Sequence, residues 1–180
     1  MFAFASITPH PPIIIPTIGS EKDLKEVRKT IEGMEKLREE MEKVKPETLI
    51  LISPHGPVGF KEMTLTQTQK LSGDFSNFGD FTSQFSFEND KEVCEKIKGE
   101  CRKQNIPLRT YNKEELDHGA LVPLYYLTDN RPNKSRIKPN EKRVFDRNSR
   151  SFDKYSSDIR IVPLAYSLLD NSWHFLFGKV

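Results

Sequence analysis

Several features that would assign a protein to a class at once are missing from this sequence of 180 residues. No apolar run approaches the roughly 18 residues of a transmembrane helix. The N-terminus lacks the basic region and apolar core of a signal peptide. No internal repeat, glycine-rich nucleotide-binding loop or lipidation motif occurs. These absences predict a protein that is not inserted in a membrane, and a cytoplasmic location is the default expectation.

Cysteine and net charge are also scarce. Cys94 and Cys101 are the two cysteines, and they lie seven residues apart in a predicted helix, so no disulfide framework is expected. Both thiols should be reduced and packed against the core. The 28 Lys and Arg residues oppose 26 Asp and Glu residues, and a net charge of +2 does not favour a nucleic-acid partner.

What is present suits one soluble domain over residues 1–180. Apolar residues make up 36% of the chain and charged residues 30%, which supports a core with a well-solvated surface. Residues 129–158 differ from the rest, with nine Lys and Arg against five Asp and Glu, a local charge of +4. We interpret this stretch as a basic, flexible insertion. A solvated loop is the simplest explanation, and an acidic partner is the alternative.

Hydrophobic periodicity predicts an α/β fold with a mostly parallel central sheet and flanking helices. The segments 2–7 and 48–52 are apolar and β-branched, and a helix with one apolar stripe separates them, so they should form a parallel βαβ unit. Later segments continue the alternation of strands and helices. The expected elements are strands at 2–7, 48–52, 63–71, 106–111 and 159–169, and helices at 20–44, 88–104 and from 118.

Two histidines follow predicted strands in matching turns. The sequence reads Thr8-Pro9-His10-Pro11-Pro12 after the first strand and Ser53-Pro54-His55-Gly56-Pro57 after the second. Proline and glycine end a strand, so each imidazole should lie at the carboxyl end of the sheet, where α/β proteins bind ligands. His10 and His55 are therefore a candidate metal pair. Neutral imidazoles suit Fe, Zn, Cu or Ni, so the pair alone does not select the metal.

A third histidine, His118, stands at the predicted start of a helix, between Asp117 and Gly119. A helix N-terminus favours a neutral imidazole, which suits proton transfer. Asp117 or Asp170 could supply a carboxylate ligand. His174, embedded between Trp173 and Phe175, is interpreted as a packing residue.

Two apolar stretches have open interpretations. Residues 71–81, with Phe85 and Phe87 beyond, form an aromatic-rich loop that either anchors itself to the core or lines a pocket for a flat substrate. Residues 11–16, rich in proline and isoleucine, should serve as a pocket wall or a subunit contact. The second possibility makes a homodimer plausible.

These stretches together resemble the catalytic B-subunit family of class III extradiol ring-cleavage dioxygenases. The resemblance rests on the two Pro-His turns, on Gly73-Asp74-Phe75 followed by Phe78-Gly79, on residues 116–124 around Asp117-His118-Gly119, and on Val162-Pro163-Leu164, in the family's order. The group includes the Memo-like proteins and the protein B of three-part Memo–radical-SAM systems.

The resemblance implies a non-haem Fe(II) held by His10 and His55, with His118 as the acid/base residue. It implies catechol-type small molecules and O₂ as substrates, opened next to the diol. A runner-up function is a non-catalytic or redox-linked metal-binding protein of the Memo-like kind that acts through partners, and a zinc hydrolase is a third.

The sequence departs from the family in its C-terminal part. The family's glutamate ligand and a second catalytic histidine, in a Ser-Gly-Asp-Leu-Ser-His-like stretch, have no match here. Three interpretations follow: the chain is part of a longer enzyme, it completes its site from a partner subunit, or it is a relative that no longer cleaves rings. Whether it is an enzyme therefore stays open at this stage.

Overall fold

The structure is a computed structural model that describes residues 3–128 and 159–166. The predicted insertion at 129–158, Asp170 and His174 lie outside the described residues. Strands are β1 (Thr48–Ser53), β2 (Met63–Thr66), β3 (Lys70–Phe75), β4 (Asp80–Glu88), β5 (Leu108–Tyr111) and β6 (Arg160–Ala165). Helices are α1 (Glu21–Glu26), α2 (Arg28–Val44), α3 (Lys91–Lys103) and α4 (His118–Leu127), with 3₁₀ turns η1 (Pro12–Ile14) and η2 (Ser76–Phe78).

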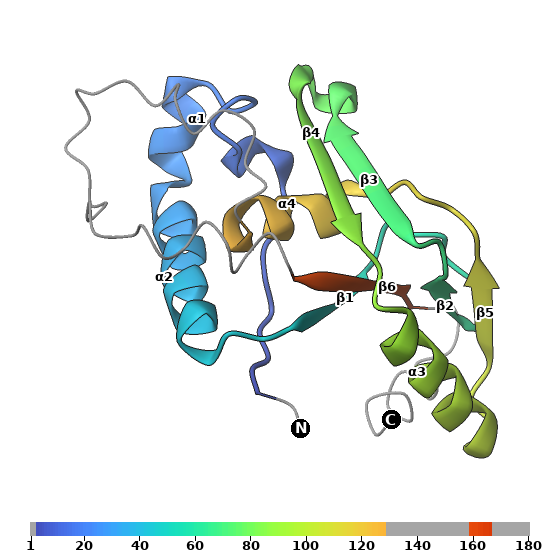
Figure 1. Ribbon diagram of the computed structural model, residues 1–180. Coiled ribbons are helices and arrows are strands. Elements are labelled where there is room, and N and C mark those ends of the chain that lie inside the picture. Colours follow the sequence, from blue (N-terminus) through green and yellow to red (C-terminus); the bar gives the residue numbers. More distant parts are fainter. Residues whose placement is uncertain (1–2, 129–158, 167–180) are drawn as a thin grey trace.

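A four-stranded sheet in the order β1-β6-β2-β5 forms the centre of the molecule (Figure 1). β1 pairs with β6 in parallel, and β2 pairs with β5 in parallel, while β6 and β2 meet antiparallel. β3 and β4 form a separate antiparallel hairpin. The expected α/β class with a mostly parallel sheet is confirmed.

Strand β6 is buried on both faces, which explains its nearly continuous apolar run. Ile161 packs into a cluster with residues of α2, α4 and the hairpin. Val162 and Leu164, on the opposite face, pack into a second cluster with α3. In Figure 1, α2 and α3 accordingly lie on opposite sides of the sheet. The carboxyl ends of β1 and β6 share one edge because Ser53 is in register with Ala165.

The predicted helix at 20–44 is present, as two consecutive helices. Ser20 accepts a hydrogen bond from the backbone N–H of Asp23, whose carboxylate accepts in return from the Ser20 N–H, so the helix begins with a capping box. The break falls at Val27, and Lys45 ends α2 in the left-handed conformation. Met34 and Met41 of the apolar stripe are buried against α4 and the sheet.

The prediction of a strand at 2–7 is wrong for residues 3–7, the part of this segment that the structure describes. These residues are irregular, and Ile7 is fully exposed. A strand needs a partner ladder as well as β-branched residues, and β1 pairs with β6 rather than with this segment. The parallel partner of β1 therefore comes from the far end of the described chain, and the expected βαβ unit does not form.

The segment predicted as one strand at 63–71 is two strands. All four residues of β2 are buried, and β3 begins at Lys70. The predicted aromatic loop is the β3–β4 hairpin, closed by η2. Phe75, Phe85 and Phe87 are buried in the main core, so for these three the anchoring interpretation is confirmed.

The remaining described elements follow the predictions closely. α3, β5 and α4 lie within the expected ranges, and Cys94 and Cys101 are buried and free. Burial raises the pKa of the Cys94 thiol to about 11. Within residues 11–16, Ile14 and Ile15 are buried and the Tyr126 hydroxyl donates to the Ile14 carbonyl, while Pro11, Ile13 and Pro16 are exposed. None of the helices in the described ranges has the length and apolar character needed to cross a bilayer.

Candidate metal centre

Three histidines from distant parts of the chain converge near the carboxyl edge of β1. His10 lies in the irregular segment before η1, His55 in the loop after β1, and His118 at the first position of α4. One ring nitrogen from each lies within 4.8 Å of the other two. Within the described residues this group contains histidines and no carboxylate.

The separations suit a single metal ion. The Nε2 atoms of His10 and His55 are 3.1 Å apart. Two nitrogens bound to one ion at about 2.1 Å each can be up to about 4.2 Å apart, so this pair can bind one ion without moving. Without an ion, the same contact is a hydrogen bond if one of the two nitrogens carries a proton. The donor set therefore fits a divalent transition metal.

The rings are arranged so that His118 packs against His55. Their centroids are 4.3 Å apart and their planes differ by 25°, a stacked arrangement. His10 lies at 5.0 Å from His55 and 5.9 Å from His118, with its ring tilted to both. Three imidazoles so close together are costly to protonate at the same time.

Burial and neighbouring charge lower the pKa of His118. The largest cause is loss of hydration, and repulsion from His55 adds to it, while the carboxylate of Asp117 opposes both. A lowered pKa keeps the imidazole neutral at pH 7, as a ligand or a proton acceptor requires.

A chain of hydrogen bonds joins the His55 loop to the His118 helix. The His55 backbone N–H donates to the hydroxyl oxygen of Ser53 at 3.2 Å. The Ser53 hydroxyl in turn donates to Oδ1 of Asp117 at 2.5 Å. Oδ1 also accepts from the Gly119 N–H at 2.7 Å, which makes Asp117 the N-cap of α4. We name these residues, Ser53, Asp117 and Gly119, the Ser53–Asp117 clamp.

Gly119 is the position at which the clamp tolerates no side chain. A Cβ added there would lie 2.5 Å from Oγ of Ser53, 2.8 Å from Oδ1 of Asp117 and 3.2 Å from Cδ2 of His55. Close approach of the helix to the loop, rather than an unusual backbone angle, explains the glycine.

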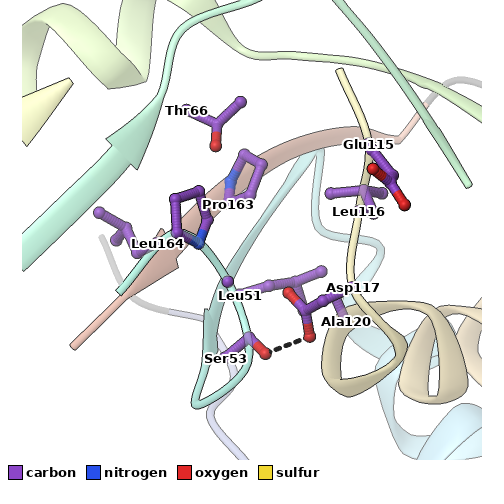
Figure 2. A pocket seen from close by; sticks show the side chains of 11 residues that line it. Leu51, Ser53, Thr66, Glu115, Leu116, Asp117, Ala120, Pro163 and Leu164 are labelled. Atoms are coloured by element: carbon purple, nitrogen blue, oxygen red, sulfur yellow. Dashed lines mark hydrogen bonds between the residues drawn. The ribbon is translucent and has the colours of Figure 1, made fainter. Parts of the chain in front are cut away.

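A small cavity lies beside the clamp, between the ends of β1 and β6 and the start of α4. Figure 2 shows Ser53 and Asp117 joined across one side of it. Its volume of about 10 Å³ gives room for about one water molecule rather than a substrate. Its lining includes Thr66 and Glu115 but none of the three histidines, so substrate access to the metal centre does not run through it.

His10 is held differently, through the residues that follow it. η1 places Ile14 and Ile15 in the core, and the Thr17 hydroxyl donates to Asp80 of the hairpin at 2.6 Å. The buried Asp80 carboxylate also accepts from Thr82 and Ser83. Burial alone would raise the pKa of Asp80, but these hydrogen bonds outweigh it and hold the pKa well below its usual value.

The structure brings together all three histidines singled out in the sequence. Asp117, considered as a carboxylate ligand, instead uses Oδ1 in the clamp and is not in the ligand group. Ser53 and Gly119 were missed as positioning residues. The signal for Ser53 was the hydroxyl residue that precedes Pro-His in both turns, whereas only the three-dimensional contact identifies Gly119.

One curated protein and one solved structure show similarity to this chain. A protein of Clostridium acetobutylicum, named by its locus tag, is 25% identical over 181 residues. The match covers 96% of this chain but 33% of that protein, so this chain spans about a third of the relative's length. A solved futalosine hydrolase mutant of Helicobacter pylori is 10% identical, with 81% of this chain and 69% of that chain covered; its TM-score of 0.34 carries no argument.

The profile of one family, described as the catalytic LigB subunit of aromatic ring-opening dioxygenase, matches residues 4–139. The matched range includes all three histidines and the clamp. The chain therefore belongs to the LigB family of aromatic ring-opening dioxygenase catalytic subunits.

Proposed function

We propose that this chain provides the metal centre of an extradiol ring-cleavage dioxygenase that acts on catechol-type substrates with O₂ at a non-haem Fe(II). The observation that carries the proposal is the convergence of three imidazole nitrogens within 4.8 Å, in a chain of the LigB family. When bound, Fe(II) would lower the pKa of a catechol and bring the two reactants together.

In this proposal the three histidines divide the work. His10 and His55 hold the metal through their Nε2 atoms, which already face each other at 3.1 Å. His118, neutral and stacked on His55, accepts a proton from the substrate at a ring nitrogen and returns it later. The clamp keeps the His118 ring at a fixed position relative to His55.

Anaerobic titration with Fe(II), followed by calorimetry, tests the metal site. Stoichiometric binding is expected for the unaltered chain, and His10→Ala and His55→Ala should each abolish tight binding because two nitrogens would be left at most. His118→Ala should retain the metal and lose turnover of catechols. Loss of the metal in His118→Ala would make His118 a third ligand instead.

His174→Ala is the matched control, a fourth histidine changed in the same way. Metal binding should be unaffected. Equal loss of binding in His10→Ala, His55→Ala and His174→Ala, together with a lower melting temperature in each, would mean that the fold fails and that the assigned site is wrong.

A second candidate function is a non-catalytic or redox-linked metal-binding protein of the Memo-like kind that acts through partners. It is favoured by the ligand group itself, which among the described residues contains three histidines and no carboxylate. Tight metal binding without O₂ uptake in the presence of catechols would support it. Stronger binding of Zn²⁺ than of Fe(II), with hydrolysis that is insensitive to O₂, would point to a zinc enzyme.

A partner subunit or a second copy of the chain could supply the carboxylate that the family uses. Sedimentation of the chain with and without metal distinguishes these cases. A dimer that forms only with metal would place a ligand in the second copy, whereas a monomer that binds metal tightly would show that one chain holds the site.

A further inference from the structure

Phe78, at the tip of the β3–β4 hairpin, lies directly beside the metal centre. Its ring centroid is 5.2 Å from that of His118, and the two rings are inclined by 66°. Phe75, Phe85 and Phe87 of the same hairpin are buried in the core, but Phe78 remains 37% exposed. One aromatic ring of the hairpin therefore stands at the surface next to the imidazoles.

The turn that carries Phe78 is fixed by its own side chains. Asp74 accepts hydrogen bonds from the backbone N–H of Ser76 at 2.9 Å and from its hydroxyl at 2.6 Å. Gly79 closes the turn with a φ of 87°, a value that strongly favours glycine. The short 3₁₀ turn between them leaves the Phe78 backbone little freedom.

The hairpin is also tied to the segment that carries His10. Asp80, two residues after Phe78, accepts from the Thr17 hydroxyl at 2.6 Å. The position of Phe78 is thus set relative to His118 by direct contact and relative to the His10 segment by a buried carboxylate.

We infer that Phe78 is a specificity-determining residue, whose ring packs against the ring of an aromatic substrate held at the metal centre. The inference rests on the proposed function. A planar aromatic substrate with a polar edge needs polar groups at that edge and an apolar surface against its ring. The three histidines offer the first, and Phe78 is the exposed aromatic side chain in ring contact with them among the described residues.

Two small chelators that share one metal-binding group test the ring contact directly. Benzohydroxamate carries an aromatic ring and acetohydroxamate a methyl group, and both are titrated anaerobically into the Fe(II)-loaded chain. Phe78→Ala should weaken benzohydroxamate binding by about 3- to 10-fold, the usual size of an aromatic pair contact. Acetohydroxamate affinity and Fe(II) affinity should stay within about twofold of the wild-type values, because neither ligand has an aromatic ring for Phe78 to contact.

Phe81→Ala is the matched control. Phe81 lies on the same hairpin and is 78% exposed, but it makes no ring contact with the histidines in the described structure. It should change neither affinity. Phe78→Leu, which keeps apolar bulk without the ring, should fall between the wild type and Phe78→Ala for benzohydroxamate.

The inference is wrong if Phe78→Ala weakens both hydroxamates equally, since Phe78 would then support the histidines rather than the ligand. It is also wrong if neither affinity changes. Nitrocatechol binding to the unaltered, Fe(II)-loaded chain tests the proposed function separately. If nitrocatechol binds, either of these two results contradicts the role of Phe78 alone and not the proposed catechol substrate. No nitrocatechol binding, with the expected hydroxamate pattern, would contradict the proposed catechol substrate and still support the aromatic contact.

Discussion

The metal centre has two sides that are built in different ways. His55 and His118 are attached to regular elements, the end of β1 and the start of α4, which the Ser53–Asp117 clamp joins through three hydrogen bonds. His10 comes from an irregular segment whose Ile7 is fully exposed. Phe4 of this segment packs partly buried against the core, and the hydrogen-bonded anchors follow His10 in the chain.

The side with His55 and His118 is therefore preformed, whereas the side with His10 has fewer restraints. The stacked pair His55 and His118 keeps its geometry through part-buried hydrogen bonds among the Ser53 hydroxyl, the Asp117 carboxylate and two backbone N–H groups, so it needs no metal to be organised. His10 is fixed in relation to them through η1 and through Thr17 and Asp80. Changes to the first side should damage metal binding more than changes of similar size to the second.

The largest effect is expected from Gly119→Ala, which breaks the preformed side. The new methyl group would lie within 3 Å of both Ser53 and Asp117, so the loop and the helix must separate. We expect a loss of about 1–3 kcal/mol of stability, the usual cost of overpacking, and about a 10- to 100-fold loss of Fe(II) affinity, as when a metal ligand loses its support. Thermal unfolding and calorimetric titration measure the two effects.

Gly99→Ala provides the control for this prediction. Gly99 lies within α3, and an added Cβ there meets no atom within 4 Å. Alanine should stabilise the helix by up to about 1 kcal/mol and leave Fe(II) affinity unchanged. Fe(II) affinity in Gly119→Ala equal to that of this control would show that the clamp does not position the histidines.

Asp80→Asn tests the anchor of the His10 side, and its effect on stability should depend on pH. The lowered pKa of Asp80 means that its ionised form stabilises the folded state at pH values above about 4, the pKa of the unfolded chain. That stability is lost as the pH falls from about 4 through the lowered folded-state pKa. We expect Asp80→Asn to cost about 1–3 kcal/mol at pH 7, since hydroxyl donors would face an amide.

Denaturant unfolding at pH 7 and at decreasing pH below 4 measures this difference. The difference in the free energy of unfolding between Asp80→Asn and the unaltered chain should become smaller as the pH falls. A gap that stays constant over the whole range would mean that the Asp80 charge contributes nothing to stability.

Thr17→Ala removes a single hydrogen bond from the same anchor and should have a smaller effect. Thr82 and Ser83 still donate to Asp80, so the carboxylate keeps partners. We expect about 1 kcal/mol of lost stability and a change in Fe(II) affinity below about tenfold. A loss of Fe(II) affinity as large as that of Gly119→Ala would show that the two sides are equally sensitive.

The sequence predicted the preformed side better than the other. An apolar strand that ends in Pro-His and a helix that begins at Asp-His-Gly are local patterns, and both His55 and His118 follow or begin the elements that those patterns predicted. The family resemblance implied their roles, with His55 as a metal ligand and His118 as an acid/base residue. The clamp was not predictable, because it depends on how closely α4 approaches the end of β1, which no periodicity encodes.

For the N-terminal segment, the local sequence pattern gave a wrong prediction of secondary structure. Residues 2–7 are as apolar as a strand, but strand formation depends on a partner, and the sequence does not say which strand lies next to β1. That neighbour is β6, more than a hundred residues later in the chain. The hairpin at 70–88 was missed for a related reason, since glycine and serine around Phe75 and Phe78 are as typical of a loop as of a tight turn.

The smallest effect is expected from Ile7→Ser. The side chain is fully exposed, so exchanging it for a polar residue should change the free energy of unfolding by less than about 0.5 kcal/mol. If residues 3–7 instead formed a buried strand in solution, as their composition suggests, burying serine in place of isoleucine would cost at least about 2 kcal/mol. Leu65→Ser, in a fully buried position of β2, shows the size of such a loss. Denaturant unfolding of the two variants therefore decides whether His10 belongs to an unpaired segment or to the sheet, and with it whether the two sides of the metal centre really differ.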